Sequence, residues 1–163
     1  MHPDELLKKA LIFIDAEKSM TLATSRDDRP WAAPVYYVRR AGGFYFFSGS
    51  KARHIRQSAG GGRAAAAIGN AAGDWRQIRG IQMSGAIRQV SPGVAAAKAV
   101  GAYLKKFPMT NEFFDHGQLP DLQAFGDKFR VRFYCFVPDL VYYLDNAVRF
   151  GFRERIFLEP EKF

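Results

Sequence analysis

Cysteine is almost absent from this 163-residue sequence, in which Cys135 is the only one. A single thiol can form neither an internal disulfide nor a thiolate metal site, so the chain fits a reducing compartment. Histidine is also scarce: only His2, His54 and His116 are present, and no two of them stand at a spacing typical of metal ligands. We therefore expect no metal centre.

Long apolar runs are lacking as well. The longest, over 64–69 and 133–137, are far shorter than the roughly 20 residues that a bilayer-spanning helix needs. The first residues are acidic and lead into an amphipathic stretch, which is the wrong order for a secretory signal. The sequence therefore predicts a cytoplasmic protein with no membrane partner.

Acidic residues are few beside the basic ones. Lys and Arg number 24 against 16 Asp and Glu, which gives a formal net charge of +8 and points to an anionic partner. The basic residues are scattered along the chain instead of forming one stripe, so a nucleic-acid partner is not expected. Because 48% of the residues are hydrophobic and 15% aromatic, the chain can bury a core, which excludes a disordered protein.

The polar and apolar pattern predicts a mainly β fold. Helices are expected over 4–17, over 50–58 and from Pro92 to about 107. Strands are expected over 20–25, 31–39, 44–48, 63–69, 79–91, 128–137, 140–144 and 153–158.

Short turns join most of these strands, and the long crossover helices of a parallel sheet are missing. We predict an antiparallel six- to seven-stranded split β-barrel with flanking helices, in a single domain over 1–163. Its core would span about 20–145, with a C-terminal extension over 146–163.

The segment over 46–56 is the sharpest candidate site. A strand ends at Ser48, the chain turns at Gly49, and a helix is expected to begin at Ser50 and carry Lys51 and His54. Hydroxyls, a helix start and a cation suit one phosphate group. The alternative is a serine-capped basic surface helix, and the local pattern favours neither.

Two further segments suit a planar ligand. Trp75 and Gln77 precede a glycine-bearing strand, where an indole wall and an amide could hold a heterocycle. Ala33, Pro34 and Val35 lie in a strand that Pro34 interrupts, which leaves an open edge. A packing tryptophan and a plain edge strand are the alternatives. No familiar catalytic motif is present, so the catalytic residues are unknown.

Together these segments resemble the FMN-binding split-barrel superfamily of pyridoxamine 5′-phosphate oxidase, and within it the small bacterial YhbP-like branch. The resemblance rests on four stretches, at 20–25, 29–37, 44–56 with Lys51 and His54, and 74–85. It implies a homodimer with two FMN molecules at the interface.

By the same resemblance, Ser48, Ser50 and Lys51 would hold the FMN phosphate, with His54 beside them. Ala33, Pro34 and Val35 would lie along the isoalloxazine ring. The loop of Trp75 and Gln77 would close the pocket, from the same subunit or from its partner.

The oxidases' substrate motif has no counterpart over 141–146, so vitamin B6 oxidase activity is not implied. We expect a flavin-dependent oxidoreductase with a small-molecule redox substrate of unknown identity. FAD or a deazaflavin could replace FMN. A haem protein with His54 or His116 as axial ligand, and a flavin-binding module without turnover, are the alternatives.

Overall fold

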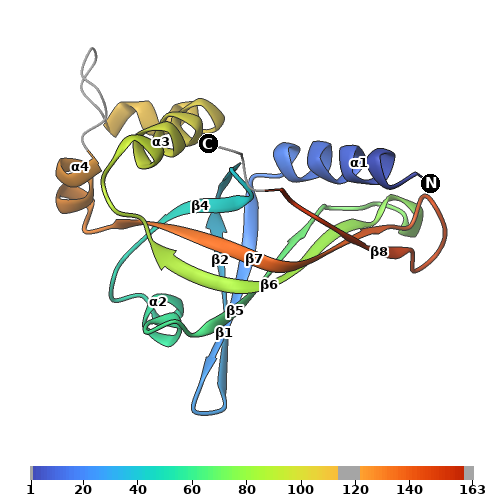
Figure 1. Cartoon of the computed structure of the whole chain (residues 1–163), viewed down its shortest axis with the longest axis horizontal. Coiled ribbons are helices and arrows are strands. Elements are labelled where there is room, and N and C mark those ends of the chain that lie inside the picture. Colours follow the sequence, from blue (N-terminus) through green and yellow to red (C-terminus); the bar gives the residue numbers. More distant parts are fainter. Residues whose placement is uncertain (1, 114–121, 160–163) are drawn as a thin grey trace.

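The computed structural model describes residues 2–113 and 122–159, which build one curled antiparallel sheet surrounded by helices (Figure 1). Within these residues the sheet has eight strands: β1 (Ser19–Arg26), β2 (Arg29–Tyr36), β3 (Val38–Arg40), β4 (Gly43–Ser48), β5 (Arg63–Gly69), β6 (Arg79–Gln89), β7 (Arg132–Asp145) and β8 (Arg153–Ile156). The mainly β, antiparallel fold predicted from the sequence is confirmed.

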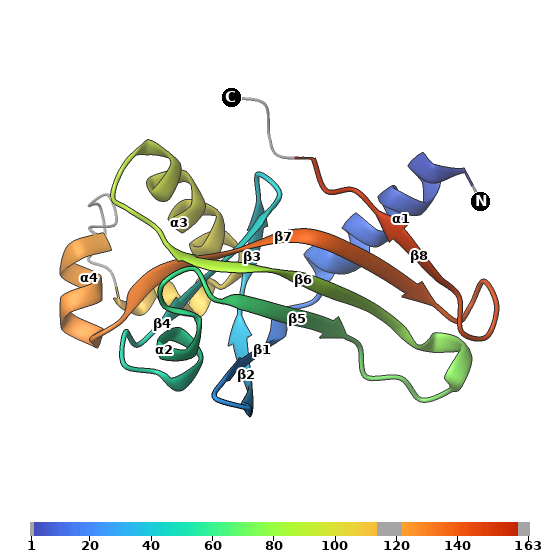
Figure 2. The ribbon, with the colours of Figure 1, turned by 60° about the horizontal axis from the view of Figure 1, so that its bottom comes forward.

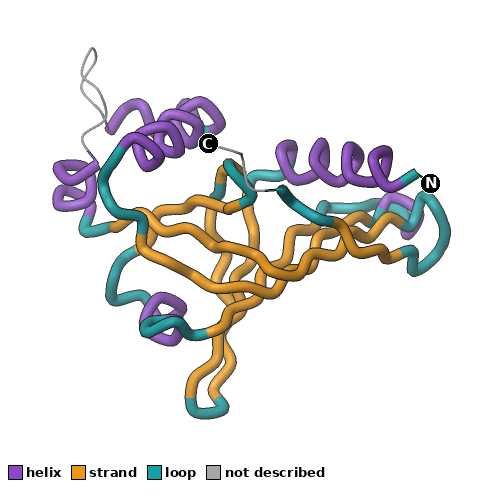
Figure 3. The backbone as a smooth tube through the Cα atoms, in the orientation of Figure 1, coloured by secondary structure: helices purple, strands orange, loops and turns teal. Residues whose placement is uncertain are grey.

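The strand order explains why the sheet curls. Seven strands follow the order β2-β1-β5-β6-β7-β4-β3, and β8 pairs with the far end of β7. The strands β2 and β3 follow one another in sequence and are separated by Tyr37 alone, yet they stand at the two ends of this order. The sheet must therefore curl to bring its ends together, which gives a half-open barrel (Figure 3).

The helices lie around this sheet. They are α1 (Pro3–Ala16), α2 (Arg53–Ser58), α3 (Val94–Lys106) and α4 (Leu122–Phe129), with short 3-10 turns at η1 (Trp75–Gln77) and η2 (Pro108–Phe113). In Figure 2, α3 and α4 lie at one end of the long strands, while α1 lies toward the other end. None of the helices in the described ranges is long and apolar enough to cross a membrane.

Helix α1 begins as predicted from its first residues. Pro3 occupies the first turn, where its missing N–H leaves no bond unmade, and Asp4 and Glu5 follow it near the positive end of the helix dipole. The helix buries Leu6, Ala10, Phe13 and Ile14 in the main core. The helix therefore covers one opening of the barrel.

The strand β4 and the first residues of β7 are buried on both faces. Phe44 and Phe46 point into the main core, whereas Tyr45 and Phe47 pack with a second cluster formed by α3. The ring of Phe47 meets Tyr103 of α3 edge-on, with 5.1 Å between centroids. Because one apolar cluster covers each face of the sheet here, consecutive aromatic residues in these strands can all be buried.

The strand expected over 128–137 begins later than predicted. Helix α4 extends to Phe129, and Arg130 ends it with a positive φ of 54°, so that β7 starts at Arg132. The rings of Phe125 and Phe129 contact each other at a tilt, and Phe125 also contacts Phe47. This aromatic packing on β4 stabilises a helix where the local alternation favoured a strand. The β7 strand then continues unbroken to Asp145, through the break expected at residues 138–139.

Candidate functional site

The β1–β2 hairpin projects from the sheet and carries one wall of the candidate site (Figure 1). Asp27 and Asp28 form its two-residue turn with φ values of 52° and 59°, which is the twist that such tight hairpins require. The strands predicted over 20–25 and 31–39 left five residues for this turn, so the turn is shorter than predicted. As a result Arg26 and Arg29 face one another across the last pair of the ladder.

Helix α2 is tied to this hairpin by hydrogen bonds to both strands. The Thr24 hydroxyl donates to Gln57 Oε1 at 2.7 Å, and Gln57 Nε2 donates to the Arg29 carbonyl at 2.9 Å. Arg26 also donates to the carbonyl of Ala59, just beyond the helix. The side chains of α2 are thereby held at a set position relative to β1 and β2.

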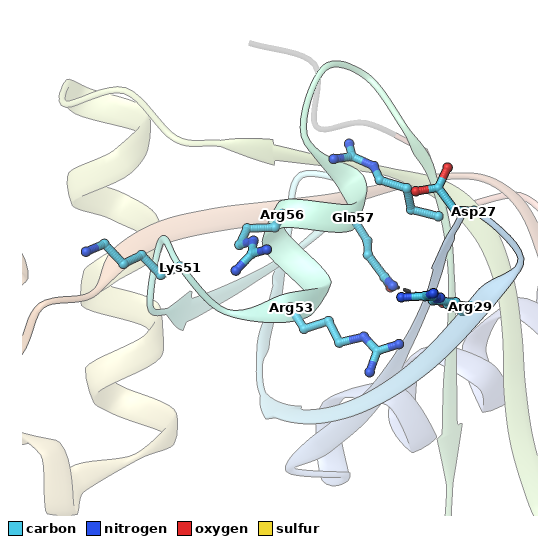
Figure 4. Close-up of a pocket in the computed structure, with 7 residues that line it drawn as sticks. Asp27, Arg29, Lys51, Arg53, Arg56 and Gln57 are labelled. Carbon is cyan, nitrogen blue, oxygen red and sulfur yellow. Dashed lines mark hydrogen bonds between the residues drawn. The ribbon is translucent and has the colours of Figure 1, made fainter.

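Between α2 and the hairpin lies a pocket of about 360 Å³ with a strongly positive lining. Its walls are Arg26, Asp27, Arg29, Lys51, Arg53, Arg56 and Gln57, most of which are drawn and labelled in Figure 4. Five of these side chains are cationic and one is anionic, so the lining carries four net positive charges. An anion is the natural occupant.

The pocket cations differ from many arginines elsewhere in the chain. Carboxylates pair with arginine in Arg39–Asp15, Arg63–Asp139, Arg76–Asp74, Arg79–Asp145 and Arg132–Asp127. Within residues 2–113 and 122–159, no salt bridge engages any of the five cations of the pocket. No salt bridge among these described residues therefore offsets the mutual repulsion of the five cations.

The predicted phosphate site is only partly assembled as expected. Helix α2 begins at Arg53 instead of Ser50, and its N-cap residue Ala52 makes no side-chain capping bond. Residues 49–52 form a turn closed by the bond from the Ala52 N–H to the Gly49 carbonyl. Ser50 is thus an exposed turn residue and not a helix cap, while Lys51 does line the pocket.

Ser48 and His54 lie beneath the pocket and do not line it. The Ser48 hydroxyl and His54 Nε2 are 2.8 Å apart, and both side chains are buried. This bond explains the turn at 49–52, which brings the imidazole back over the end of β4. Burial lowers the pKa of His54 below its ordinary value of 6.5, so the ring is neutral at pH 7.

His54 should make the protein less stable in acid. Because its pKa is lowered in the folded state, the unfolded state takes up the proton first, and the free energy of unfolding falls as the pH drops below about 6.5. The variant His54→Gln cannot titrate and should flatten this decline in urea unfolding curves measured between pH 7 and pH 5.

Two control variants isolate the effect of His54. His2→Gln removes a surface histidine and should leave the decline intact, as should Ser48→Ala, which keeps the buried imidazole. An unchanged pH dependence in His54→Gln would contradict the prediction.

The predicted ring-binding strand lies at an open edge of the sheet. β2 ends the strand order, so one of its edges carries backbone groups that are not paired within the described chain. Pro34 and Val35, with Ser19 and Tyr36, line a shallow hollow of about 290 Å³, while Ala33 is buried beside them. This apolar surface suits the flat face of an aromatic ligand.

Trp75 and Gln77 lie far from Lys51 within the chain. They sit in η1, next to the start of β6 at Arg79, whereas α2 precedes β5 at Arg63, which pairs with Ala86 near the other end of β6. Figure 2 shows η1 and α2 at opposite ends of the long strands. One chain therefore does not bring Trp75 to the cationic pocket.

The η1 loop is well ordered by its own contacts. Asn146 donates to the Trp75 carbonyl, and Gln77 Oε1 accepts from the Gly73 N–H. The indole meets Phe150 edge-on at 5.6 Å and is 43% exposed. Aromatic side chains are therefore exposed on the surface at this end of the sheet.

The sequence analysis missed most of the pocket lining. Arg26, Arg29, Arg53, Arg56 and Gln57 were not among the predicted site residues, although all five line the pocket. The signal lay in two arginines three residues apart at the expected helix, Arg53 and Arg56, and in the two arginines that flank the Asp27–Asp28 turn. Only the tertiary structure shows that helix α2 and the β1–β2 hairpin lie next to each other.

The described residues thus form a curled antiparallel half-barrel with a cationic pocket beside an open edge strand. Residues 6–135 match the model of the family described as pyridoxamine 5′-phosphate oxidase. The chain belongs to this family.

Individual relatives are more distant. A UPF0306 protein of Klebsiella pneumoniae is 26% identical over 141 residues, which cover 85% of this chain and 84% of the relative. A haem-binding protein of Mycobacterium smegmatis superposes with a TM-score of 0.69 at 20% identity, over 92% of this chain and 57% of that one. An FAD-binding protein of Mesorhizobium loti gives 0.61 at 16% identity, over 86% and 92%. At such identities the structures share the fold.

Proposed function

We propose that this protein binds FMN and acts as a flavin-dependent oxidoreductase on a small-molecule substrate, with the flavin at a homodimer interface. The observation that carries the proposal is the pocket beside α2, whose five cations have no carboxylate partner among the described residues. FMN, when bound, would supply the exchange of electrons with the substrate. The residues of the chain bind and orient it.

The residues present fit the phosphate of such a cofactor. A phosphate monoester carries about −1.5 to −2 charge at pH 7 and offers three acceptor oxygens. Lys51 and Arg56 line the pocket, no salt bridge among the described residues engages them, and Ser50 lies exposed beside Lys51. Hydrogen bonds to a charged partner contribute on the order of 1.5–3 kcal/mol each, so two or three of them suffice to anchor one phosphate.

The edge of β2 fits the ring. Ala33 to Val35 begin four residues after Arg29 on the same strand, which is about 13 Å at roughly 3.3 Å per residue. This separation leaves room for a sugar-alcohol chain between a phosphate at the pocket and a ring at the strand. The unpaired backbone groups of the edge can bond the polar rim of the heterocycle, while the apolar side chains exclude water.

A second copy of the chain would cover the face that a monomer leaves open. Ala32, Ala23 and Ala65 stand side by side on β2, β1 and β5, and all three are exposed. Nearby, Trp31 and Tyr36 expose 43% and 51% of their surface. Small side chains allow close approach of another sheet, and exposed apolar surface favours association.

Dimerisation would also explain the aromatic loop of η1. Trp75 and Phe150 are exposed. The η1 turn that carries Trp75 lies at the opposite end of the long strands from α2 and the cationic pocket. In a dimer Trp75 and Phe150 could cover the flavin of the partner. The two halves of one cofactor site would then come from different subunits.

The first test is the visible absorbance of the purified protein before and after FMN is added. We expect flavin bands that dithionite bleaches, one FMN per chain, and a dimer by light scattering. Protein that takes up no FMN at micromolar concentration would refute the proposal.

Mixed dimers test whether the site is shared. Lys51→Glu and Trp75→Ala each damage one half of every site in their own homodimers. A dimer of one chain of each should regain one intact site, and therefore about half of the flavin bound by the unaltered protein. Mixed dimers that bind no more than the average of their parents would show that Trp75 does not act across the interface.

Haem is the alternative cofactor that the same spectrum would reveal. A Soret band in place of flavin bands would support it. The geometry favours flavin, because His54 is buried and its Nε2 is held by Ser48 at 2.8 Å. The other candidate ligand, His116, lies outside the described residues.

A further inference from the structure

The net positive charge of the pocket lining exceeds the negative charge of the proposed FMN phosphate. Its lining carries four net positive charges, whereas a phosphate monoester brings at most two negative ones. Arginine clusters without carboxylate partners are unfavourable by themselves, so the surplus points to a further anionic group.

The cations fall into two groups within the pocket. Arg53 places its guanidinium 4.6 Å from the centroid of the Trp31 ring on β2. Trp31 and Arg29 are two residues apart on that strand, so their side chains share a face. Arg53 and Arg29 therefore stand on the same side of the pocket, toward the hairpin.

Lys51 belongs to the other group. Figure 4 shows Arg53 extending toward the side of Arg29 and Gln57, whereas Lys51 extends in the opposite direction, with Arg56 on its side of the helix. Because Lys51 and Arg53 extend away from one another, their charged ends cannot both contact the same phosphate. The two groups of cations thus offer two anion positions along one pocket.

We propose that the pocket holds two phosphate groups together, one between Lys51 and Arg56 and a second between Arg29 and Arg53. The first position is the one that the proposed function gives to the FMN phosphate, and the inference rests on that function only for this assignment. The second phosphate comes either from a cofactor with an internal diphosphate, such as FAD, or from a separate phosphorylated dinucleotide, such as NADPH.

Trp31 adds an aromatic surface beside the second position. Its indole is 43% exposed and already lies against the Arg53 guanidinium. A planar base attached to the second phosphate could stack on the same ring system. This surface favours a nucleotide over a simple inorganic anion.

Inorganic diphosphate and inorganic phosphate are the probes that test the pocket directly, by calorimetry at constant ionic strength. We expect diphosphate to bind at least tenfold more tightly than phosphate. Arg29→Ala and Arg53→Ala should each remove most of this advantage while changing the affinity for phosphate less than threefold. Lys51→Ala should weaken both anions.

Arg155→Ala is the matched control, because Arg155 is an exposed arginine of β8 outside the pocket. It should leave both affinities unchanged. Equal affinities for the two anions, or the same loss in Arg155→Ala as in Arg29→Ala, would overturn the inference.

The source of the second phosphate follows from two comparisons. Tighter binding of FAD than of FMN, lost in Arg29→Ala, would place the diphosphate within the cofactor. Tighter binding of NADPH than of NADH to the FMN-loaded protein, lost in the same variant, would place the second phosphate on a separate ligand. If the protein shows neither the preference for FAD nor the preference for NADPH, the proposal is overturned.

Different results would refute the flavin proposal and the proposal of a second phosphate position. Uptake of FMN with no preference for diphosphate would leave the flavin site standing and remove the second phosphate position. A preference for diphosphate without any uptake of flavin would support the two phosphate positions and refute the flavin proposal.

Discussion

A Gly85→Ala variant is expected to lose about 3 kcal/mol of its free energy of unfolding. A Cβ at this position would lie 2.2 Å from the Val137 carbonyl oxygen and 2.8 Å from the Cα of Pro138. Both are backbone atoms of the paired strand, so no side-chain rotation can make room. Urea unfolding followed by circular dichroism measures the loss.

The close approach has a structural cause. The ladder between β6 and β7 shifts register between Ser84 and Gly85, where Pro138 stands opposite the glycine. Pro138 has no N–H to donate to the ladder, and Asp139 has no paired residue at the register shift. The Asp139 carboxylate accepts a hydrogen bond from Arg63 of β5. Glycine lets the two backbones come together at this bulge.

Gly69→Ala is the matched control, because it lies in β5 of the same sheet and an added Cβ would meet nothing within 4 Å. We expect its stability to change by less than about 1 kcal/mol. Equal stability of Gly85→Ala and Gly69→Ala would contradict the close contact at the bulge.

Reversing the charge at two pocket positions is expected to abolish flavin binding. In Lys51→Glu/Arg56→Glu, two attractive contacts to the FMN phosphate become repulsive, and we expect the affinity for FMN to fall at least 100-fold. Quenching of flavin fluorescence during titration measures it. The same variant should unfold at equal or slightly higher urea concentration without flavin, because it relieves repulsion among cations that have no carboxylate partner in the described chain.

Arg153→Glu/Arg155→Glu on β8 makes the same change in net charge away from the pocket. It should keep the affinity within about threefold, since general attraction of anions by the whole protein is weak at physiological salt. If both double variants lost the same affinity, the flavin phosphate would not sit at Lys51 and Arg56.

The local elements were predictable where short-range physics decides them. The amphipathic pattern and the Pro3 start of α1 and the alternation of β6 follow from neighbouring residues. The hairpin of β1 and β2 was also predicted, but its turn at Asp27–Asp28 is shorter than the predicted one. The α4 region was not predictable in this way. A strand was predicted from residue 128 and no element over 122–127, but the contacts of Phe125 with Phe47 and with Phe129 favour a helix.

The candidate site shows the same division. Lys51 could be singled out from the hydroxyl and cation pattern that follows β4, and the structure places it in the pocket. Ser48 and His54 were expected to face a ligand, yet they bond each other in the interior. A sequence pattern does not say which face of a six-residue helix the core will cover.

By itself the sequence determined the mainly β class, the antiparallel connections and the excess of positive charge, because hydrophobic period, turn residues and composition act locally or in sum. The tertiary structure decided where that charge gathers. Gln57 ties α2 to the hairpin through Thr24 and Arg29, and this contact over about 30 residues assembles the cations into one pocket. Such a contact depends on the curl of the whole sheet, which no single segment encodes.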